Sequence, residues 1–155
     1  MSFDYRRGVF GFLATDAEGA NGMNGLDDQV LALRWIRDYV PYFGGDGDAV
    51  TVVGTGPDGA AAACLLAVAP AARGLFHRAA LQGGECLVGD GRTGGRRGVL
   101  AGPDGYARTL AVLRERNATL EELADPDLFP AREIAGALRD TVPILDRSVL
   151  PDWPR

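Results

Sequence analysis

Residues 49–67, AVTVVGTGPDGAAAACLLA, run from a short apolar strand through a glycine-rich turn into a helix of small residues. Residues 49–53 are apolar on both faces of the expected strand, as in a central strand of a parallel sheet. Pro57 suits the first turn of the helix, which we expect over 57–69, because the N–H it lacks would have no intrahelical partner there. A turn of this form either binds phosphate or aims a catalytic side chain.

Elements on both sides of this stretch extend the same pattern. Residues 26–36 carry apolar side chains at three- and four-residue steps, which predicts an amphipathic helix of about four turns that ends before Pro41. The runs FHRAALQGG at 76–84 and VFGFL at 9–13 predict further strands. Strands that alternate with helices indicate an α/β fold with a mostly parallel sheet.

The second half of the chain has a weaker pattern. Residues 85–105 are rich in Gly and Arg and are expected to form a flexible loop. Residues 106–155 are expected to be a helical segment followed by an extended, proline-containing tail, with helices over 106–116 and 130–139.

Composition excludes several classes of protein. The formal net charge of −5 argues against general binding to nucleic acid, and the local cluster of Arg92, Arg96 and Arg97 is best explained as a solvated loop. No apolar run is long enough to cross a membrane, so membrane attachment is expected only through segments outside this chain. Cys64 and Cys86 are too few for a disulfide framework, and Cys64 is expected to be a buried free thiol.

The turn itself, Gly54-Thr55-Gly56-Pro57-Asp58-Gly59, spells the dinucleotide-binding pattern G-x-G-x-x-G. That pattern needs an acidic residue at the end of the next strand, where this chain has Gln82. Pro57 also removes one N–H from the turn, and Asp58 places a negative charge where phosphate would bind. We therefore expect no cofactor here, and no residue pattern predicts a metal site.

The alternative is a nucleophile elbow of the form G-x-S-x-G, but Gly56 occupies the place of the nucleophile. The chain has two serines, Ser2 and Ser148, and one histidine, His77, which is expected to be structural. Asp58 as the nucleophile would shift the register by two residues and would still lack a histidine base. An N-cap or turn role is expected for it instead.

Three longer runs surround the turn: DYRRGVFGFLAT, NGMNGLDDQVLALRWIRDYVPYFGGDGDAVTVVG and LLAVAPAARGLFHRAALQGG. They resemble the type B carboxylesterase, or cholinesterase-like, family, whose patterns include F-G-G-D-P-x-x-V-T-x-F-G-E-S-A-G and S-x-G-L-F-x-x-A-I-x-Q-S-G. The best match covers residues 4–84, with a fainter one in the tail VPILDRSVLPDWP. The resemblance implies that residues 1–155 are one partial α/β-hydrolase domain with helices on both faces of its sheet.

The departures from the family pattern fall at the catalytic positions. The family's serine aligns with Gly56, the alanine after it aligns with Pro57, and one extra residue lies near Asp58. The family's oxyanion loop is expected upstream of this chain, and its acid and histidine downstream. The resemblance thus implies that residues 54–59 are a degenerate elbow and that the chain holds no catalytic residue.

Within the family, such losses are typical of the surface adhesion proteins: neuroligins, neurotactin, glutactin and gliotactin. The resemblance therefore implies a catalytically inactive, extracellular or cell-surface domain that binds a protein partner, with homodimerisation as a further expectation. Two alternatives stay open. The chain is part of an active type B carboxylesterase that hydrolyses carboxylic esters, or it is a fragment without independent function.

One short motif agrees with an extracellular setting. Asn117-Ala118-Thr119 forms an N-glycosylation sequon, which makes Asn117 the candidate glycosylation site. Such triplets also arise by chance. Thr119 has an alternative role as the cap of a short helix that begins with LEELA.

Overall fold

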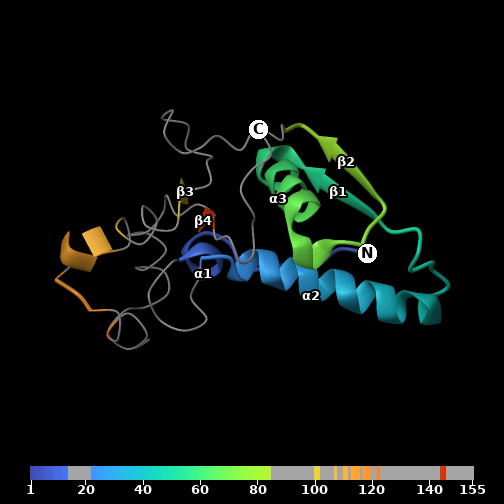
Figure 1. Cartoon of the computed structure of the whole chain (residues 1–155), viewed down its shortest axis with the longest axis horizontal. Helices are drawn as coiled ribbons and strands as arrows, with labels where there is room; N and C mark the ends of the chain where they lie inside the picture. Colours follow the sequence, from blue (N-terminus) through green and yellow to red (C-terminus); the bar gives the residue numbers. More distant parts are fainter. Residues whose placement is uncertain are drawn as a thin grey trace. The chain divides into compact units, whose positions relative to one another are not determined.

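The computed structural model describes residues 1–13, 22–84 and 100–101, and beyond them residues 107, 110–111, 113–115, 117–119, 122 and 144–145 (Figure 1). The chain divides into two compact units. The first comprises Met1–Tyr5, Leu26–Val88 and Arg147–Arg155, and the second comprises Arg6–Gly25 and Gly89–Asp146. Each unit is described by itself below.

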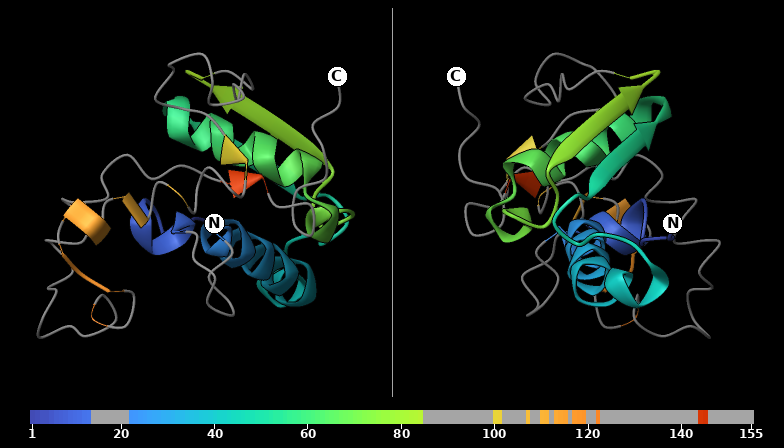
Figure 2. Two further views of the ribbon diagram at one scale, coloured as in Figure 1. Left: turned by 60° about the vertical axis from the view of Figure 1, so that its left-hand side comes forward. Right: turned by 90° about the vertical axis from the view of Figure 1, so that its right-hand side faces the viewer.

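The first unit is built around a parallel strand–helix–strand motif. Strand β1 (Thr51–Thr55) leads into helix α3 (Gly56–Val68), and a turn of 3₁₀ helix, η2 (Pro70–Ala72), leads on toward strand β2 (Arg78–Gln82). The two strands pair in parallel, from Thr51 opposite Arg78 to Thr55 opposite Gln82. Figure 2 shows both strands lying along α3, which confirms the parallel order expected from the sequence.

The strand pair is largely exposed. Gly54 of β1 is buried, whereas the side chain of Val53 is 62% exposed and that of Leu81 in β2 is 40% exposed. The expectation that this strand is covered on both faces is therefore wrong for this chain. In the parallel register Val53 and Leu81 lie on opposite faces of the pair. Every residue of β2 is exposed, so neither face is fully covered.

Helix α2 (Asn24–Tyr39) confirms the predicted amphipathic helix and is followed by the 3₁₀ turn η1 (Val40–Phe43). One side of α2 is fully buried at Leu26, Val30 and Leu33. The other buried apolar residues of the first unit come from α3 and the segment after it: Ala60, Ala63, Cys64, Leu65, Leu66, Ala69, Ala72 and Leu75. Small side chains dominate α3, so it can lie close to the sheet.

The expected strand at 9–13 is wrong. Residues Val9–Phe12 form a short helix, α1, in which the Phe12 N–H donates to the Gly8 carbonyl at 2.9 Å. A five-residue apolar run has no period that separates a buried strand from a buried helix. Close packing of the backbone is what distinguishes the two in this chain. A Cβ on Gly11 would clash with the Arg6 carbonyl and would lie 3.3 Å from the Gly25 Cα.

The second unit contains one short parallel pair, strand β3 (Leu100–Ala101) with strand β4 (Ile144–Leu145). The expectation that 85–105 is entirely loop is thus wrong at its apolar end, where two residues find a pairing partner far along the sequence. The residues described between 107 and 115 are helical, as predicted for 106–116. The predicted helix at 130–139 lies outside the described residues.

Cys64 corrects another expectation, since it is disulfide-bonded and not a free thiol. The sulfur lies in the buried part of α3, where it is 4% exposed. An apolar environment is typical of free cysteines as well as bridged ones, so composition alone did not distinguish them. The sequence contains one other cysteine, Cys86.

The bridge predicts the thiol content of the protein. In denaturant without reductant, a thiol reagent is expected to label neither of the 2 cysteines, and after reduction it should label both. Reduction is expected to destabilise the fold by about 2–4 kcal/mol, as is usual for loss of a native disulfide. Mass spectrometry after alkylation measures the labelling. Full labelling of the unreduced protein would contradict the bridge.

Two leucines of α2 provide a matched test of the core. Leu33 is 2% exposed and Leu31 is 66% exposed, so the same substitution in the same helix changes helix propensity equally. We expect Leu33→Ala to lower the free energy of unfolding by about 2–5 kcal/mol, and Leu31→Ala to change it by under ~0.5 kcal/mol. Urea titration of dilute protein measures both. Equal losses would show that α2 does not bury the face described here.

Candidate functional site

The candidate site is the junction between β1 and α3. Thr55 ends the strand in an extended conformation, with φ −108° and ψ 140°, and the next residue, Gly56, has a φ of +69° and begins the helix. This left-handed residue turns the chain from strand to helix within one residue. A sharp turn of this kind between a strand and a helix is the geometry of a nucleophile elbow.

Close backbone contact holds the junction together. A Cβ on Gly54 would clash with the Gly59 carbonyl oxygen and lie 2.6 Å from the Gly59 carbonyl carbon. A Cβ on Gly59 would in turn lie 3.3 Å from the carbonyl carbon of Gly54. The elbow pattern places its second small residue two positions after the nucleophile, whereas Gly59 lies three positions after Gly56. The extra residue predicted from the sequence is therefore absorbed within the first turn of α3.

The position of the nucleophile is open but carries no reactive group. A Cβ on Gly56 would meet nothing within 4 Å, so the turn leaves space for a side chain there. The next residue, Pro57, has no backbone N–H, although an active elbow uses that N–H to bind the oxyanion. Gly56 thus supplies no hydroxyl and Pro57 no N–H, which are the two groups that an active elbow provides at these positions.

Asp58 is not the N-cap of α3, which was one of the two roles expected for it; the turn role stays a prediction. Helix α3 begins at Gly56, so its N-cap is Thr55, and Asp58 lies inside the first helical turn. The Thr55 side chain makes no capping hydrogen bond. The side chains of Pro57 and Asp58 lie outside the described set. The helix begins earlier than expected because glycine adopts the positive φ needed at the turn.

Gly83 is a neighbour of the turn that the sequence analysis did not single out. It follows β2, and a Cβ built on it would lie 3.8 Å from both the backbone N and the Cα of Gly56. In a parallel pair the carboxyl ends of both strands meet at one edge, so the residues after Thr55 and Gln82 come together. The parallel order of β1 and β2, which the sequence predicts, is therefore the signal that could have identified the contact between Gly83 and Gly56.

His77 lies at the other end of the strand pair. Its N–H donates to the Val50 carbonyl at 2.8 Å, just before β2 begins, and its side chain is exposed. Five residues of strand separate it from the end of β2 beside the elbow, which is roughly 16 Å at about 3.3 Å per residue. This placement puts the His77 side chain out of reach of a group at residue 56, so His77 cannot act as its base.

The other candidate groups are dispersed. Ser2 is exposed near the N-terminus, and Ser148 is outside the described residues. Across the residues that the structure describes, no group of His, Cys, Asp and Glu side chains is arranged to bind a metal ion. The same residues include no helix that is long and apolar enough to cross a membrane.

The sequon lies in a helix-capping structure. The Thr119 N–H and hydroxyl both donate to Glu122 Oε2, at 2.8 and 3.0 Å, and the Glu122 N–H donates to Thr119 Oγ1 at 3.2 Å. This reciprocal arrangement is a capping box, so the alternative role of Thr119 as a cap is confirmed. Asn117 is exposed and has a φ of +50°.

Comparison with known proteins finds one family. Residues 1–101 match the profile of the Carboxylesterase family. Neuroligin-3 of Mus musculus is 35% identical over 170 aligned residues, covering 99% of this chain and 19% of the neuroligin. Carboxylesterase 5A of Felis catus is 37% identical, covering 99% of this chain and 28% of that protein. The chain thus spans about a fifth to a quarter of the length of these relatives.

Solved esterase structures share the fold. A thermophilic PNB esterase superposes with a TM-score of 0.75 at 27% identity, covering 96% of this chain and 32% of that one. A Geobacillus stearothermophilus carboxylesterase gives a TM-score of 0.74 at 32% identity, covering 95% and 31%. The expected α/β-hydrolase fold is confirmed.

Substitution of Gly54 and of Gly56 by alanine is predicted to have different costs in stability. Gly54→Ala forces a Cβ into the Gly59 backbone and is expected to cost about 3 kcal/mol of stability, the upper range for overpacking. Gly56→Ala meets open space and costs only the strain of a left-handed alanine, about 1 kcal/mol. Chemical denaturation measures both variants. A Gly54→Ala protein as stable as Gly56→Ala would contradict the contact between strand and helix.

Proposed function

Since the chain belongs to the carboxylesterase family, we propose that it is a noncatalytic member whose domain binds protein partners at a cell surface. One observation carries the proposal. The elbow turn is kept, with Gly56 at φ +69°, yet the nucleophile is replaced by glycine and the donor that follows it by proline.

The two replacements act on the same reaction. Loss of the nucleophile removes the covalent step, and loss of one oxyanion donor commonly lowers the rate by about 10²–10³-fold. The only histidine of the chain is at the far end of β2, out of reach of the elbow. The close contact between Gly54 and Gly59 maintains the fold of the turn without its chemistry, and binding is a function that such a fold still supports.

The presence of neuroligins among the relatives supports an adhesion role. Neuroligins and carboxylesterases both align along 99% of the chain, and the family's adhesion members are the ones in which loss of catalytic residues is expected. The proposal includes an extracellular or cell-surface location and a protein partner, with a homodimer as one form of it. Asn117, exposed in the structure, is the proposed glycosylation site.

Ester hydrolysis is the second candidate. The solved structures that share the fold are esterases, and a carboxylesterase is among the relatives with 37% identity. In this alternative the turn at residues 54–59 supplies no nucleophile, so the reactive groups would have to come from outside it. The two candidate functions are distinguished by whether the chain shows ester hydrolysis that depends on residues 54–59.

Labelling with an organophosphonate ester tests the proposal, with p-nitrophenyl ester hydrolysis as a second readout. We expect no covalent adduct and no hydrolysis above background, because the turn has no activated nucleophile. Asp58→Asn is the matched control, since it removes the only carboxylate of the turn, and it should behave like the unaltered chain. A carboxylesterase with an intact elbow should be labelled stoichiometrically. Stoichiometric capture within residues 54–59, seen by peptide mass spectrometry, would overturn the noncatalytic proposal.

A further inference from the structure

We propose that Glu122 regulates glycosylation of Asn117, because its capping hydrogen bonds withhold the Thr119 hydroxyl of the sequon while the segment is folded. The inference rests on the proposed function, in which Asn117 is the glycosylation site, and adds what determines whether that site is used. It is drawn within the second unit, from the described residues between 107 and 122.

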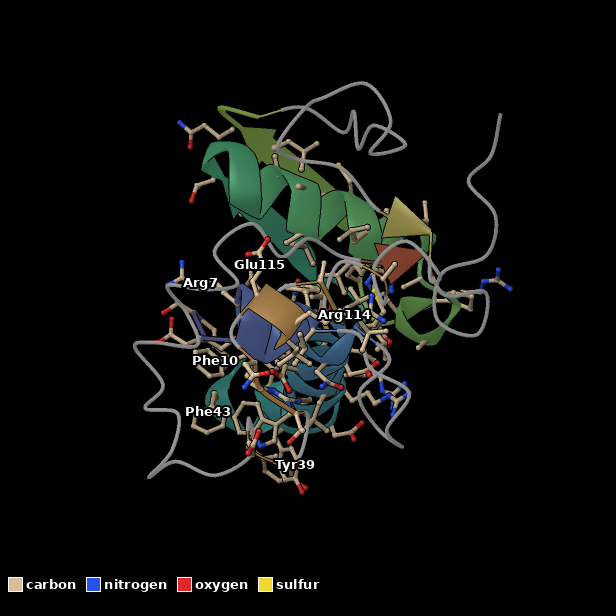
Figure 3. All side chains as sticks on the ribbon, turned by 90° about the vertical axis from the view of Figure 1, so that its left-hand side faces the viewer. Arg7, Phe10, Tyr39, Phe43, Arg114 and Glu115 are labelled. Carbon is tan, nitrogen blue, oxygen red and sulfur yellow. The ribbon has the colours of Figure 1, made fainter. Side chains whose placement is uncertain are left out.

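The first residue of the sequon ends a helix. The Ala118 N–H donates to the Leu113 carbonyl at 2.9 Å, and the Asn117 N–H donates to the Arg114 carbonyl at 3.1 Å. With a φ of +50° at Asn117, these two bonds form a Schellman motif, in which the residue just past the helix is left-handed. Figure 3 labels Arg114 and Glu115 in the helical segment that this motif ends. The backbone of the sequon is thus tied to the segment before it.

The third residue of the sequon caps the next helix. The Thr119 hydroxyl donates to Glu122 Oε2 at 3.0 Å and accepts from the Glu122 N–H at 3.2 Å. The Thr119 N–H donates to the same carboxylate oxygen at 2.8 Å. A threonine hydroxyl has one proton to donate. Its only donor is therefore committed to Glu122 in the folded chain.

That hydroxyl is the group by which a sequon is recognised. The pattern N-x-[ST] specifies two side chains, the amide that receives the sugar and a hydroxyl two residues later. Serine and threonine both satisfy it, and the hydroxyl is the functional group that they share. An enzyme that selects this pattern must therefore contact the hydroxyl. In the folded chain Asn117 presents its amide, whereas Thr119 does not present a free donor.

The reaction itself transfers one group. Asn117 Nδ2 forms a bond to the anomeric carbon of an oligosaccharide carried on a polyprenyl diphosphate. The bond between that carbon and the diphosphate oxygen breaks, the diphosphate leaves with the electron pair, and one amide proton passes to solvent. Glu122 takes no part in this chemistry. It acts on the reaction only through the conformation of Thr119.

Burial does not protect the sequon. Asn117, Thr119 and Glu122 are all exposed, so an enzyme can approach each of them. Release of the hydroxyl instead requires the cap to open, which leaves the Glu122 N–H in the first turn of its helix without its capping acceptor. Loss of an N-cap typically shifts such an equilibrium by about fivefold. Glycan addition therefore competes with formation of the cap.

The test uses unglycosylated, folded chain incubated with a purified oligosaccharyltransferase and its lipid-linked oligosaccharide, with peptide mass spectrometry as the readout. A synthetic peptide of residues 112–124 carries the same sequon and is too short to hold a stable helix in water. We expect the peptide to be modified at least about tenfold faster than the chain, because both caps hold the folded sequon.

Glu122→Ala should raise the rate of modification of the folded chain about fivefold, because only the second cap is lost. Alanine is the better helix former, so lower helix propensity cannot cause that increase. Glu122→Gln should leave the rate unchanged, since glutamine also completes a capping box. Glu115→Ala is the matched control, because it makes the same substitution at an exposed glutamate outside the capping box and should also leave the rate unchanged.

Three results would overturn the inference. They are a folded chain modified as fast as the peptide, a Glu122→Ala rate equal to that of Glu115→Ala, and a peptide that is not modified at all. Circular dichroism of each variant verifies that the overall fold is unchanged. The noncatalytic proposal would stand after any of these results, because phosphonate labelling at residues 54–59 tests it separately.

Discussion

Contact between two backbones, at Gly54 in β1 and Gly59 in α3, is the constraint on which the rest of the first unit depends. The helix can cross the strand this closely only because neither residue has a Cβ, as the clash of a Cβ on Gly54 with the Gly59 carbonyl shows. From this contact the helix runs back along the sheet. That return is what allows β2 to pair in parallel with β1, from Thr51 opposite Arg78 onward.

The same contact explains how an elbow persists without its chemistry. A nucleophile elbow has two parts, a tight crossing that sets the fold and a reactive side chain at its apex. In this chain the crossing is intact, whereas the apex is Gly56 with open space around it. Glycine relieves the strain that a serine at positive φ would carry, so loss of the nucleophile makes the turn easier to form. Stability and catalysis are therefore separable at this site.

The first unit leaves apolar side chains exposed on its strand pair and on helix α2. Both faces of the β1–β2 pair are partly open, one at Val53 and the other at Leu81, and α2 carries a second apolar side. Exposed apolar area of this size in a folded domain is typical of surfaces that meet other polypeptides.

The sequence alone predicted the strand–turn–helix at residues 49–67, the parallel order of β1 and β2, helix α2 and the empty nucleophile position, because each depends on local periodicity or on residue identity. It did not predict that residues 9–12 are helical, that Cys64 is bridged, or that β3 pairs with β4. It also gave no sign that Leu31, Trp35 and Tyr39 are exposed. These features depend on which distant segments meet, and a short apolar run or a single cysteine has the same local pattern in either arrangement. Tertiary packing decided them, since burial and partner choice are properties of the folded chain.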